Sequence, residues 1–162
     1  ELHAIWKVNF ELDAYIEKRQ FKTIPQLFQE RGEEEFRKLE RAMLEEVSAM
    51  EDVIISTGGG TACFFDNIEL MNQTGETIYL QASVDTLFDY LKTAKKGRPL
   101  LAQKNDEELY EFINENLKKR EPYYLQARHI LDSMDESDLL FDELLNSHPS
   151  NSLKRSKPTA VP

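Results

Sequence analysis

Short apolar runs alternate along this chain with longer segments in which apolar residues recur every three or four positions. The runs lie at residues 7–11, 53–56, 77–80 and 128–131, and their β-forming side chains are typical of strands, most weakly in the first run. Residues 33–50 carry apolar side chains at helical spacing with polar side chains mostly between them, which predicts an amphipathic helix. Strands separated by helices of this length need crossover connections, so we expect an α/β fold with a mostly parallel sheet.

Two further helices are predicted from their start signals. Ser83 fits the N-cap of a helix that carries apolar residues inward and stops near residues 97–99. Asn105, followed three residues later by Glu108, forms a capping-box-like pair at the start of another helix. Helices on both faces of the sheet would complete a three-layer arrangement.

The length and composition of the chain indicate a single domain. Its 162 residues are 40% hydrophobic and 31% charged, which is enough to build one core. We assign residues 1–145 to that domain. Residues 146–162 hold few large apolar side chains and a basic cluster at 154–157, which predicts a disordered tail. A short address or docking signal is the alternative interpretation of the basic cluster.

Charge and hydropathy argue against several classes of partner. A formal charge of -10 would repel the phosphate backbone of a nucleic acid. The chain has no run of about 18 apolar residues and no basic-then-apolar leader, so we expect a cytoplasmic protein without a membrane partner. Cys63 is the only cysteine, which rules out an internal disulfide, and its apolar surroundings favour a buried, inert thiol over a reactive one.

Polar residues follow the first two predicted strands. Glu11 and Asp13 lie between a strand and a helix, at the strand end where open α/β sheets bind ligands. Asp13 could instead cap the helix. Gly58, Gly59 and Gly60 come after the next strand, and three consecutive glycines let backbone N–H groups approach a ligand. A tight turn, the other interpretation, would need only one or two of them.

Three arginines are candidates for binding an anion. Arg37 lies on the amphipathic helix, Arg98 ends a predicted helix before a proline, and Arg120 opens a Pro-Tyr-Tyr segment. A guanidinium group binds carboxylate or phosphate through two hydrogen bonds, which suits a small anionic ligand. Each arginine taken singly could also be a solvated surface residue.

The order of these pieces resembles the shikimate kinase family from about residue 10 to residue 131, three quarters of the chain. The matching segments are residues 11–13 (Glu-Leu-Asp in place of D-x-D), 31–40 (G-E-x-x-F-R-x-x-E), 56–60 (S-x-G-G-G), 98–101 (R-P-L-L) and 120–124 (R-x-P-x-Y). Five elements in register make the resemblance specific.

The resemblance implies a P-loop kinase-like fold and an activity. Members of the family use ATP and Mg²⁺ to phosphorylate the 3-hydroxyl of shikimate, a step of aromatic amino acid biosynthesis. By resemblance, Arg37 and Arg120 would bind the carboxylate of shikimate. Asp13 would hold the ring hydroxyls and orient the attacking one. Glu40 would brace a neighbouring arginine.

The remaining candidates take their roles from the same resemblance. Gly58, Gly59 and Gly60 would form the loop against the shikimate ring, with backbone N–H groups of the last two offered to it. Arg98 would belong to a lid and reach the phosphate of ATP that is transferred. Glu11 and Ser56 would hold water molecules on Mg²⁺.

The chain departs from the family pattern in two places. Glu11 stands where aspartate is usual, and one extra methylene could displace Mg²⁺ by about an ångström. No G-x-x-x-x-G-K-[ST] loop occurs in the 162 residues, so we expect the ATP phosphate cradle and the central first strand of the sheet to be missing.

Two main hypotheses about function follow. The chain is a shikimate kinase with part of its sequence missing, or it is a shikimate-binding remnant that cannot use ATP. We expect a monomer in either case. A different metabolite kinase would be favoured if the substrate-side arginines pointed into solvent.

Overall fold

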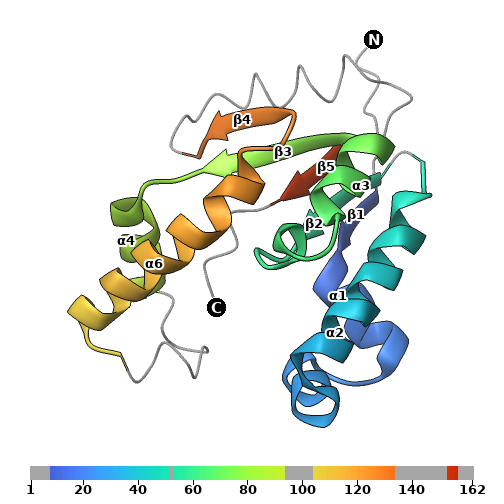
Figure 1. The fold of residues 1–162 in the computed structure, drawn as a ribbon, viewed down its shortest axis with the longest axis horizontal. Coiled ribbons are helices and arrows are strands. Elements are labelled where there is room, and N and C mark those ends of the chain that lie inside the picture. Colours follow the sequence, from blue (N-terminus) through green and yellow to red (C-terminus); the bar gives the residue numbers. More distant parts are fainter. Residues whose placement is uncertain (1–7, 52, 94–103, 134–152, 157–162) are drawn as a thin grey trace.

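The structure is a computed structural model that describes residues 8–51, 53–93, 104–133 and 153–156. Five parallel strands form one sheet in the order β1-β2-β5-β3-β4 (Figure 1). The strands are β1 (Val8–Glu11), β2 (Val53–Thr57), β3 (Glu76–Gln81), β4 (His129–Asp132) and β5 (Leu153–Ser156). The predicted α/β class and parallel sheet are therefore confirmed.

The middle of the sheet differs from what the sequence led us to expect. Without the central first strand, the predicted strands at residues 53–56 and 77–80, which are β2 and β3, would face each other across a gap or pair directly. Instead β5 lies between them, with Arg155 opposite Ser56 on one side and Ile78 on the other. Four residues of the predicted disordered tail thus form a strand, and the rest of residues 146–162 lies outside the described part. Through β5, the inner edges of β2 and β3 gain backbone hydrogen-bond partners.

A capped helix pair follows β1. Helix α1 (Leu12–Gln20) is joined by a short turn to α2 (Ile24–Ser48), which begins at a capping box between Thr23 and Gln26. The predicted helix at residues 33–50 is the second part of α2. Gly32 kinks the helix with φ of +75°, a left-handed conformation that glycine adopts without a Cβ clash.

The later helices begin where the sequence predicts. After β2 come the 3-10 helix η1 (Thr61–Cys63) and α3 (Asn67–Thr74). The Ser83 hydroxyl accepts a hydrogen bond from the Thr86 backbone N–H at the start of α4 (Val84–Thr93). Both bonds of the Asn105–Glu108 capping box are present at the start of α6 (Asp106–Tyr124). The predicted end of the helix that begins after Ser83, near residues 97–99, lies outside the described residues.

Helix α6 runs farther than its proline suggests. Pro122 lies inside the last turn, and the helix continues to Tyr124. A proline in this position removes one backbone hydrogen bond near the helix end. As a result, Arg120 and Tyr124 are four residues apart on one helix and share a face.

Two apolar clusters support these elements. The larger one joins the sheet to α1, α2, η1 and α3 through residues such as Leu12, Leu44 and Ile55. The smaller one holds α4 against α6 through Leu87, Leu91, Leu109 and Ile113. Figure 1 shows the α4–α6 pair at the opposite end of the molecule from α1 and α2. Within the described part, no helix combines the length and the apolar character needed to cross a bilayer.

Because β5 lies between β2 and β3, loss of the backbone N–H of Arg155 should destabilise the protein. Proline there has no N–H to donate to its neighbours in the sheet, so Arg155→Pro should lower the free energy of unfolding by about 1–3 kcal/mol. Arg155→Ala keeps the N–H and should change stability far less. Urea unfolding of both variants checks this, and equal stabilities would contradict the strand order.

Candidate functional site

The carboxyl ends of β1 and β2 bring two expected metal-side residues together. Glu11 and Ser56 are register partners on these neighbouring parallel strands, and Ser56 is buried. Their carboxylate and hydroxyl oxygens are ligands of the type that Mg²⁺ accepts. Among the described residues, no group of three or more His, Cys, Asp or Glu side chains could hold a metal ion. A role of Glu11 and Ser56 toward Mg²⁺ stays a prediction.

Asp13 lies in the first turn of α1 and does not cap the helix. The N-cap position belongs to Glu11, which makes no side-chain capping bond. The Asp13 carboxylate oxygens instead lie beside Gly58, 3.4 Å from where a Cβ of that residue would stand. Desolvation raises the pKa of Asp13, the neighbouring carboxylates of Glu40 and Glu17 raise it further, and the charge of Arg37 opposes them. Asp13 is thus a carboxylate that faces the glycine segment.

The three glycines follow β2 directly and adopt conformations that do not require glycine. Among described glycines only Gly32 has a positive φ, so the backbone angles at Gly58–Gly60 are open to other residues. Space is the constraint, because a Cβ on Gly60 would lie 2.8 Å from Nη2 of Arg37. The segment does turn, since the Thr61 N–H donates to the Gly58 carbonyl at 3.1 Å, but at Gly60 it is the close approach of Arg37 that calls for glycine.

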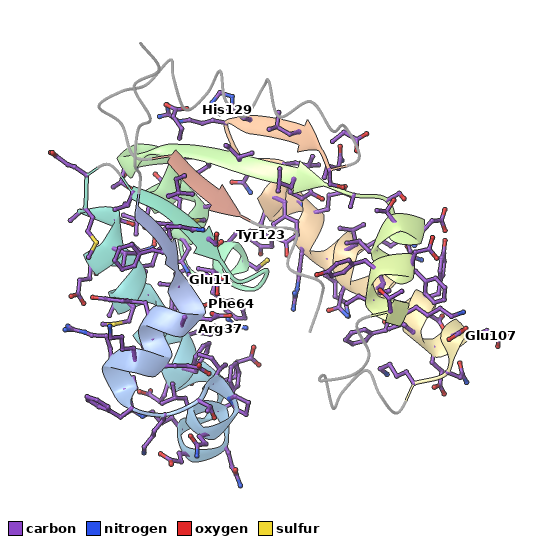
Figure 2. The ribbon with its side chains drawn as sticks, turned by 180° about the vertical axis from the view of Figure 1, so that it is seen from behind. Glu11, Arg37, Phe64, Glu107, Tyr123 and His129 are labelled. Atoms are coloured by element: carbon purple, nitrogen blue, oxygen red, sulfur yellow. The ribbon has the colours of Figure 1, made fainter. Side chains whose placement is uncertain are left out.

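Arg37 projects from α2 onto the ring of Phe64, as Figure 2 shows. Its guanidinium carbon lies 4.1 Å from the ring centroid, and the side chain is 13% exposed. Nη1 donates to Oε2 of Glu40 at 2.9 Å, while Nη2 lies 3.5 Å from the exposed carboxylate of Glu33. The buried Nε has no hydrogen-bond partner. Arg37 is therefore a part-buried cation whose buried Nε–H has no acceptor in the protein.

Glu40 is buried at 2% exposure and has two donors. Besides Arg37, the Thr61 hydroxyl donates to its Oε1 at 2.7 Å. The resemblance implied that Glu40 braces an arginine, and in the structure that arginine is Arg37. Sequence reasoning missed Thr61, although its position directly after the glycines was a usable signal.

Helix α6 brings the opposite wall of the site. Arg120 is partly buried, and its Nη1 has no hydrogen-bond partner. One turn later, the Tyr124 hydroxyl donates to the Gly59 carbonyl at 2.5 Å. Burial raises the pKa of Tyr124 to about 12, so the phenol keeps its proton for this bond at neutral pH. The phenol therefore ties α6 to the glycine segment.

Cys63 ends the short helix η1 and lies close to Gly59. Its thiol donates to the same Gly59 carbonyl at 3.7 Å, and it is half-buried. Burial raises the pKa of the thiol, while the charges of Arg120 and Arg37 lower it in part. Arg37 reaches Gly60 from α2, and Tyr124, one turn after Arg120, bonds to Gly59 from α6, so the two arginines approach the glycine segment from different helices.

The site residues thus come together with one exception. Asp13, Arg37 and the three glycines lie in one region, with Arg120 one turn before Tyr124 on the neighbouring α6 and with Glu11 and Ser56 at the β1–β2 edge. Their roles toward a ligand stay predictions. Arg98 lies outside the described residues. Sequence reasoning also missed Phe64 as the surface under Arg37, because an aromatic residue after a glycine segment carries no such signal.

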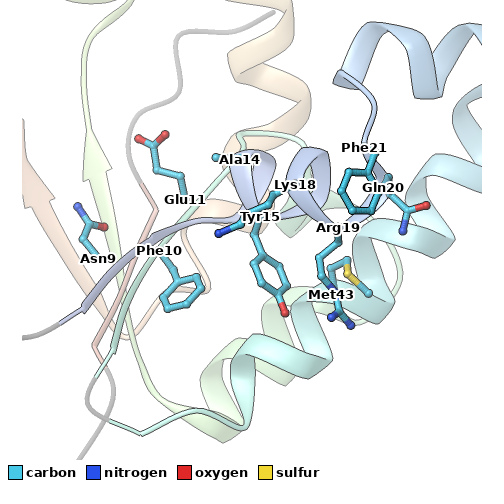
Figure 3. A pocket seen from close by; sticks show the side chains of 10 residues that line it. All are labelled: Asn9, Phe10, Glu11, Ala14, Tyr15, Lys18, Arg19, Gln20, Phe21 and Met43. Atoms are coloured by element: carbon cyan, nitrogen blue, oxygen red, sulfur yellow. The ribbon is translucent and has the colours of Figure 1, made fainter.

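A separate hollow of about 730 Å³ runs along β1 and α1 (Figure 3). It is lined by residues that include Phe10, Tyr15, Phe21 and Met43. Of the candidate residues only Glu11 borders it, so this hollow is not the region between Arg37 and Arg120.

Gly60 offers a test of the crowded position of Arg37. In Gly60→Ala the new Cβ would lie 2.8 Å from Nη2 of Arg37, so it should push the guanidinium aside and weaken its bond to the buried Glu40. We expect urea stability to fall by about 1–2 kcal/mol and a large loss of affinity for shikimate, measured by calorimetry. Gly32→Ala is the control. Its strained φ should lower stability and leave the affinity unchanged.

The raised pKa of the Cys63 thiol predicts how its rate of alkylation depends on pH. A raised pKa leaves less thiolate at any given pH, so alkylation by iodoacetamide should reach half its maximal rate above about pH 8.5, the ordinary thiol value. Mass spectrometry follows the reaction at the only cysteine in the chain. In urea the midpoint should fall back to the ordinary value. A midpoint below it in the folded protein would contradict the dominance of burial.

The sequence of this chain is similar to those of known proteins. The family model for shikimate kinase matches residues 7–148. Shikimate kinase from Phocaeicola vulgatus is 54% identical over 132 residues, which is 81% of this chain and 75% of that protein. Shikimate kinase from Parabacteroides distasonis is 51% identical over 143 residues, covering 86% and 83%.

Solved structures agree with the sequence comparison. Shikimate kinase from Bacteroides thetaiotaomicron has a TM-score of 0.77 at 45% identity, covering 88% of this chain and 82% of that one. Shikimate kinase from Acinetobacter baumannii, solved in complex with shikimate, has a TM-score of 0.71 at 28% identity over 88% and 79%. With these matches over most of its length, the chain belongs to the shikimate kinase family.

Proposed function

We propose that this protein transfers the terminal phosphoryl group of ATP to the 3-hydroxyl of shikimate. The observation that carries the proposal is a pair of buried arginine donors without protein acceptors. Among the described residues, three buried side-chain nitrogen or oxygen atoms lack a hydrogen-bond partner, and two of them are Arg37 Nε and Arg120 Nη1. A buried N–H left unpaired is costly, so such groups await an acceptor.

The chemistry of shikimate fits these donors. Its carboxylate can accept hydrogen bonds from two guanidinium groups at once, and charge-assisted bonds of this kind are the strong ones. Arg37 lies beside Gly60 from α2, and Arg120 lies on α6 one turn before Tyr124, which bonds to Gly59. The two arginines would therefore hold the carboxylate between them and fix the orientation of the ring.

The Asp13 carboxylate would position the ring hydroxyl that accepts the phosphoryl group. Its carboxylate lies next to the glycine segment, and its pKa is raised by desolvation. Accepting a hydrogen bond from the ring hydroxyl would orient that oxygen for attack, the positioning on which phosphoryl transfer depends. Gly58, Gly59 and Gly60 would line the ring, where a side chain at Gly60 has no room.

The metal and ATP side is proposed from the family. Glu11 and Ser56, side by side in register, would hold water molecules on Mg²⁺. When bound, Mg²⁺ and ATP supply charge neutralisation and the phosphoryl group. Arg98 would approach the transferred phosphate. The 162 residues contain no G-x-x-x-x-G-K-[ST] segment. We further propose a cytoplasmic monomer that has no nucleic-acid partner.

Shikimate binding to the protein tests the arginine pair directly. Arg37→Ala and Arg120→Ala should each weaken binding by about 2 kcal/mol or more, which is about 30-fold in Kd. Isothermal titration calorimetry without ATP measures this. Arg19→Ala is the matched control, because Arg19 is half-exposed and pairs with Glu46 away from the site. Unchanged affinity in both site variants would overturn the proposal.

A turnover assay distinguishes the kinase from the alternative. Release of ADP in the presence of Mg²⁺, ATP and shikimate would support the kinase. Shikimate binding with no ADP release would favour the alternative, a shikimate-binding remnant that cannot use ATP. No binding and no turnover would exclude both.

A further inference from the structure

We infer that Thr61 is a positioning residue for shikimate: its hydroxyl fixes the Glu40 carboxylate, which in turn fixes the guanidinium of Arg37. The inference rests on the proposed function, because it assigns Arg37 to the carboxylate of shikimate. The observation behind it is a three-residue chain of hydrogen bonds, Thr61 Oγ1 to Glu40 Oε1 at 2.7 Å and Arg37 Nη1 to Glu40 Oε2 at 2.9 Å.

Glu40 needs both of these donors. At 2% exposure its carboxylate receives little solvation from water, so each oxygen depends on a protein hydrogen bond. Arg37 satisfies one oxygen and Thr61 satisfies the other. Without the hydroxyl, the carboxylate would lose the bond that sets its rotation about χ3.

Thr61 is itself held rigidly. It is fully buried, and its backbone N–H donates to the Gly58 carbonyl at 3.1 Å. Its own carbonyl accepts a bond from Nδ2 of the buried Asn67 at 2.7 Å. The Asn67 Oδ1 accepts from Nη1 of Arg41 at 2.9 Å, one helical turn after Arg37 on α2. These hydrogen bonds therefore hold the Thr61 hydroxyl in one position between the glycine segment and α2.

Arg37 depends on Glu40 for its orientation. The face of the Phe64 ring supports the guanidinium plane, but a cation–π contact leaves rotation within that plane free. The other ion pair, to Glu33, is 3.5 Å long and its carboxylate is 62% exposed, so it constrains little. The short bond to Glu40 is therefore the contact that fixes the guanidinium group, including its unpaired Nε.

The inference predicts that Thr61→Val weakens shikimate binding by about tenfold, the order expected for losing one hydrogen bond to a charged group. Valine keeps the shape and removes the hydroxyl. Thr61→Ser keeps the hydroxyl and should restore the affinity to within about threefold of wild type, the usual context spread for one contact. Calorimetry measures Kd, and urea unfolding confirms that each variant is folded.

Thr57→Val is the matched control. Thr57 is equally buried, lies four residues earlier, and its hydroxyl has no hydrogen-bond partner. The same chemical change there should leave the Kd for shikimate unchanged. Equal Kd values for Thr61→Val and wild type would overturn the inference, as would equal weakening in Thr61→Ser and Thr61→Val.

A double variant tests whether the effect passes through Glu40. In the Glu40→Gln background, Arg37 has already lost its carboxylate partner, so adding Thr61→Val should change the Kd by less than about twofold. An undiminished tenfold loss in that background would show that Thr61 acts by another route and would overturn the inference.

A readout without shikimate separates this inference from the proposed function. The ¹⁵N order parameter of Arg37 Nε should fall in Thr61→Val and stay at the wild-type value in Thr61→Ser and Thr57→Val. If wild type does not bind shikimate, the proposed function is overturned, and the order parameter still decides whether Thr61 positions Arg37. An unchanged order parameter in Thr61→Val would contradict that role.

Discussion

The carboxylate of Glu40 is buried where water cannot solvate it, and the surrounding structure is arranged to supply its hydrogen bonds. One donor, Arg37, comes from the same helix three residues earlier. The other, Thr61, comes from the segment after β2. Satisfying this charge therefore joins α2 to the glycine segment, and it places the guanidinium so close to Gly60 that a side chain there has no room.

The parallel sheet supplies the second constraint. Because β1 and β2 run in the same direction and in register, Glu11 comes to lie opposite Ser56. Asp13 follows one turn into α1 and faces the segment that follows β2. Acidic side chains and glycines from separate parts of the chain thus meet at one edge, as expected for the carboxyl ends of strands in an open α/β sheet.

The site residues are carried by elements that pack on two different apolar clusters. The larger cluster supports the carboxylates, the glycines and Arg37, whereas Arg120 is carried on α6, whose other end packs against α4. The hydrogen bond from Tyr124 to Gly59 links the end of α6 to the sheet side. The position of Arg120 relative to Arg37 therefore depends on how α6 packs against both clusters.

Much of this could be predicted from the sequence. The strand runs and the caps at Ser83 and Asn105 rest on local preferences, and the structure places elements there. The strand at 153–156 could not be predicted, because Leu-Lys-Arg-Ser has no strand pattern of its own and gains its hydrogen bonds from β2 and β3. A proline usually ends or kinks a helix, yet α6 continues through Pro122 to Tyr124. The helix tolerates it because Pro122 lies in the last turn, where it removes only one backbone hydrogen bond.

The sequence by itself determined the α/β class, the family and the identities of the candidate residues, because periodicity, capping and motif order are local properties of the chain. Only the tertiary structure decided which of these residues meet. Thr61 and Glu40 are 21 positions apart, and Tyr124 and Gly59 are 65 apart. Such pairings depend on how helices and strands pack and on the direction that packing imposes on each side chain. For that reason Arg37 could be named from the sequence, but its ring support, its buried carboxylate and the threonine behind it could not.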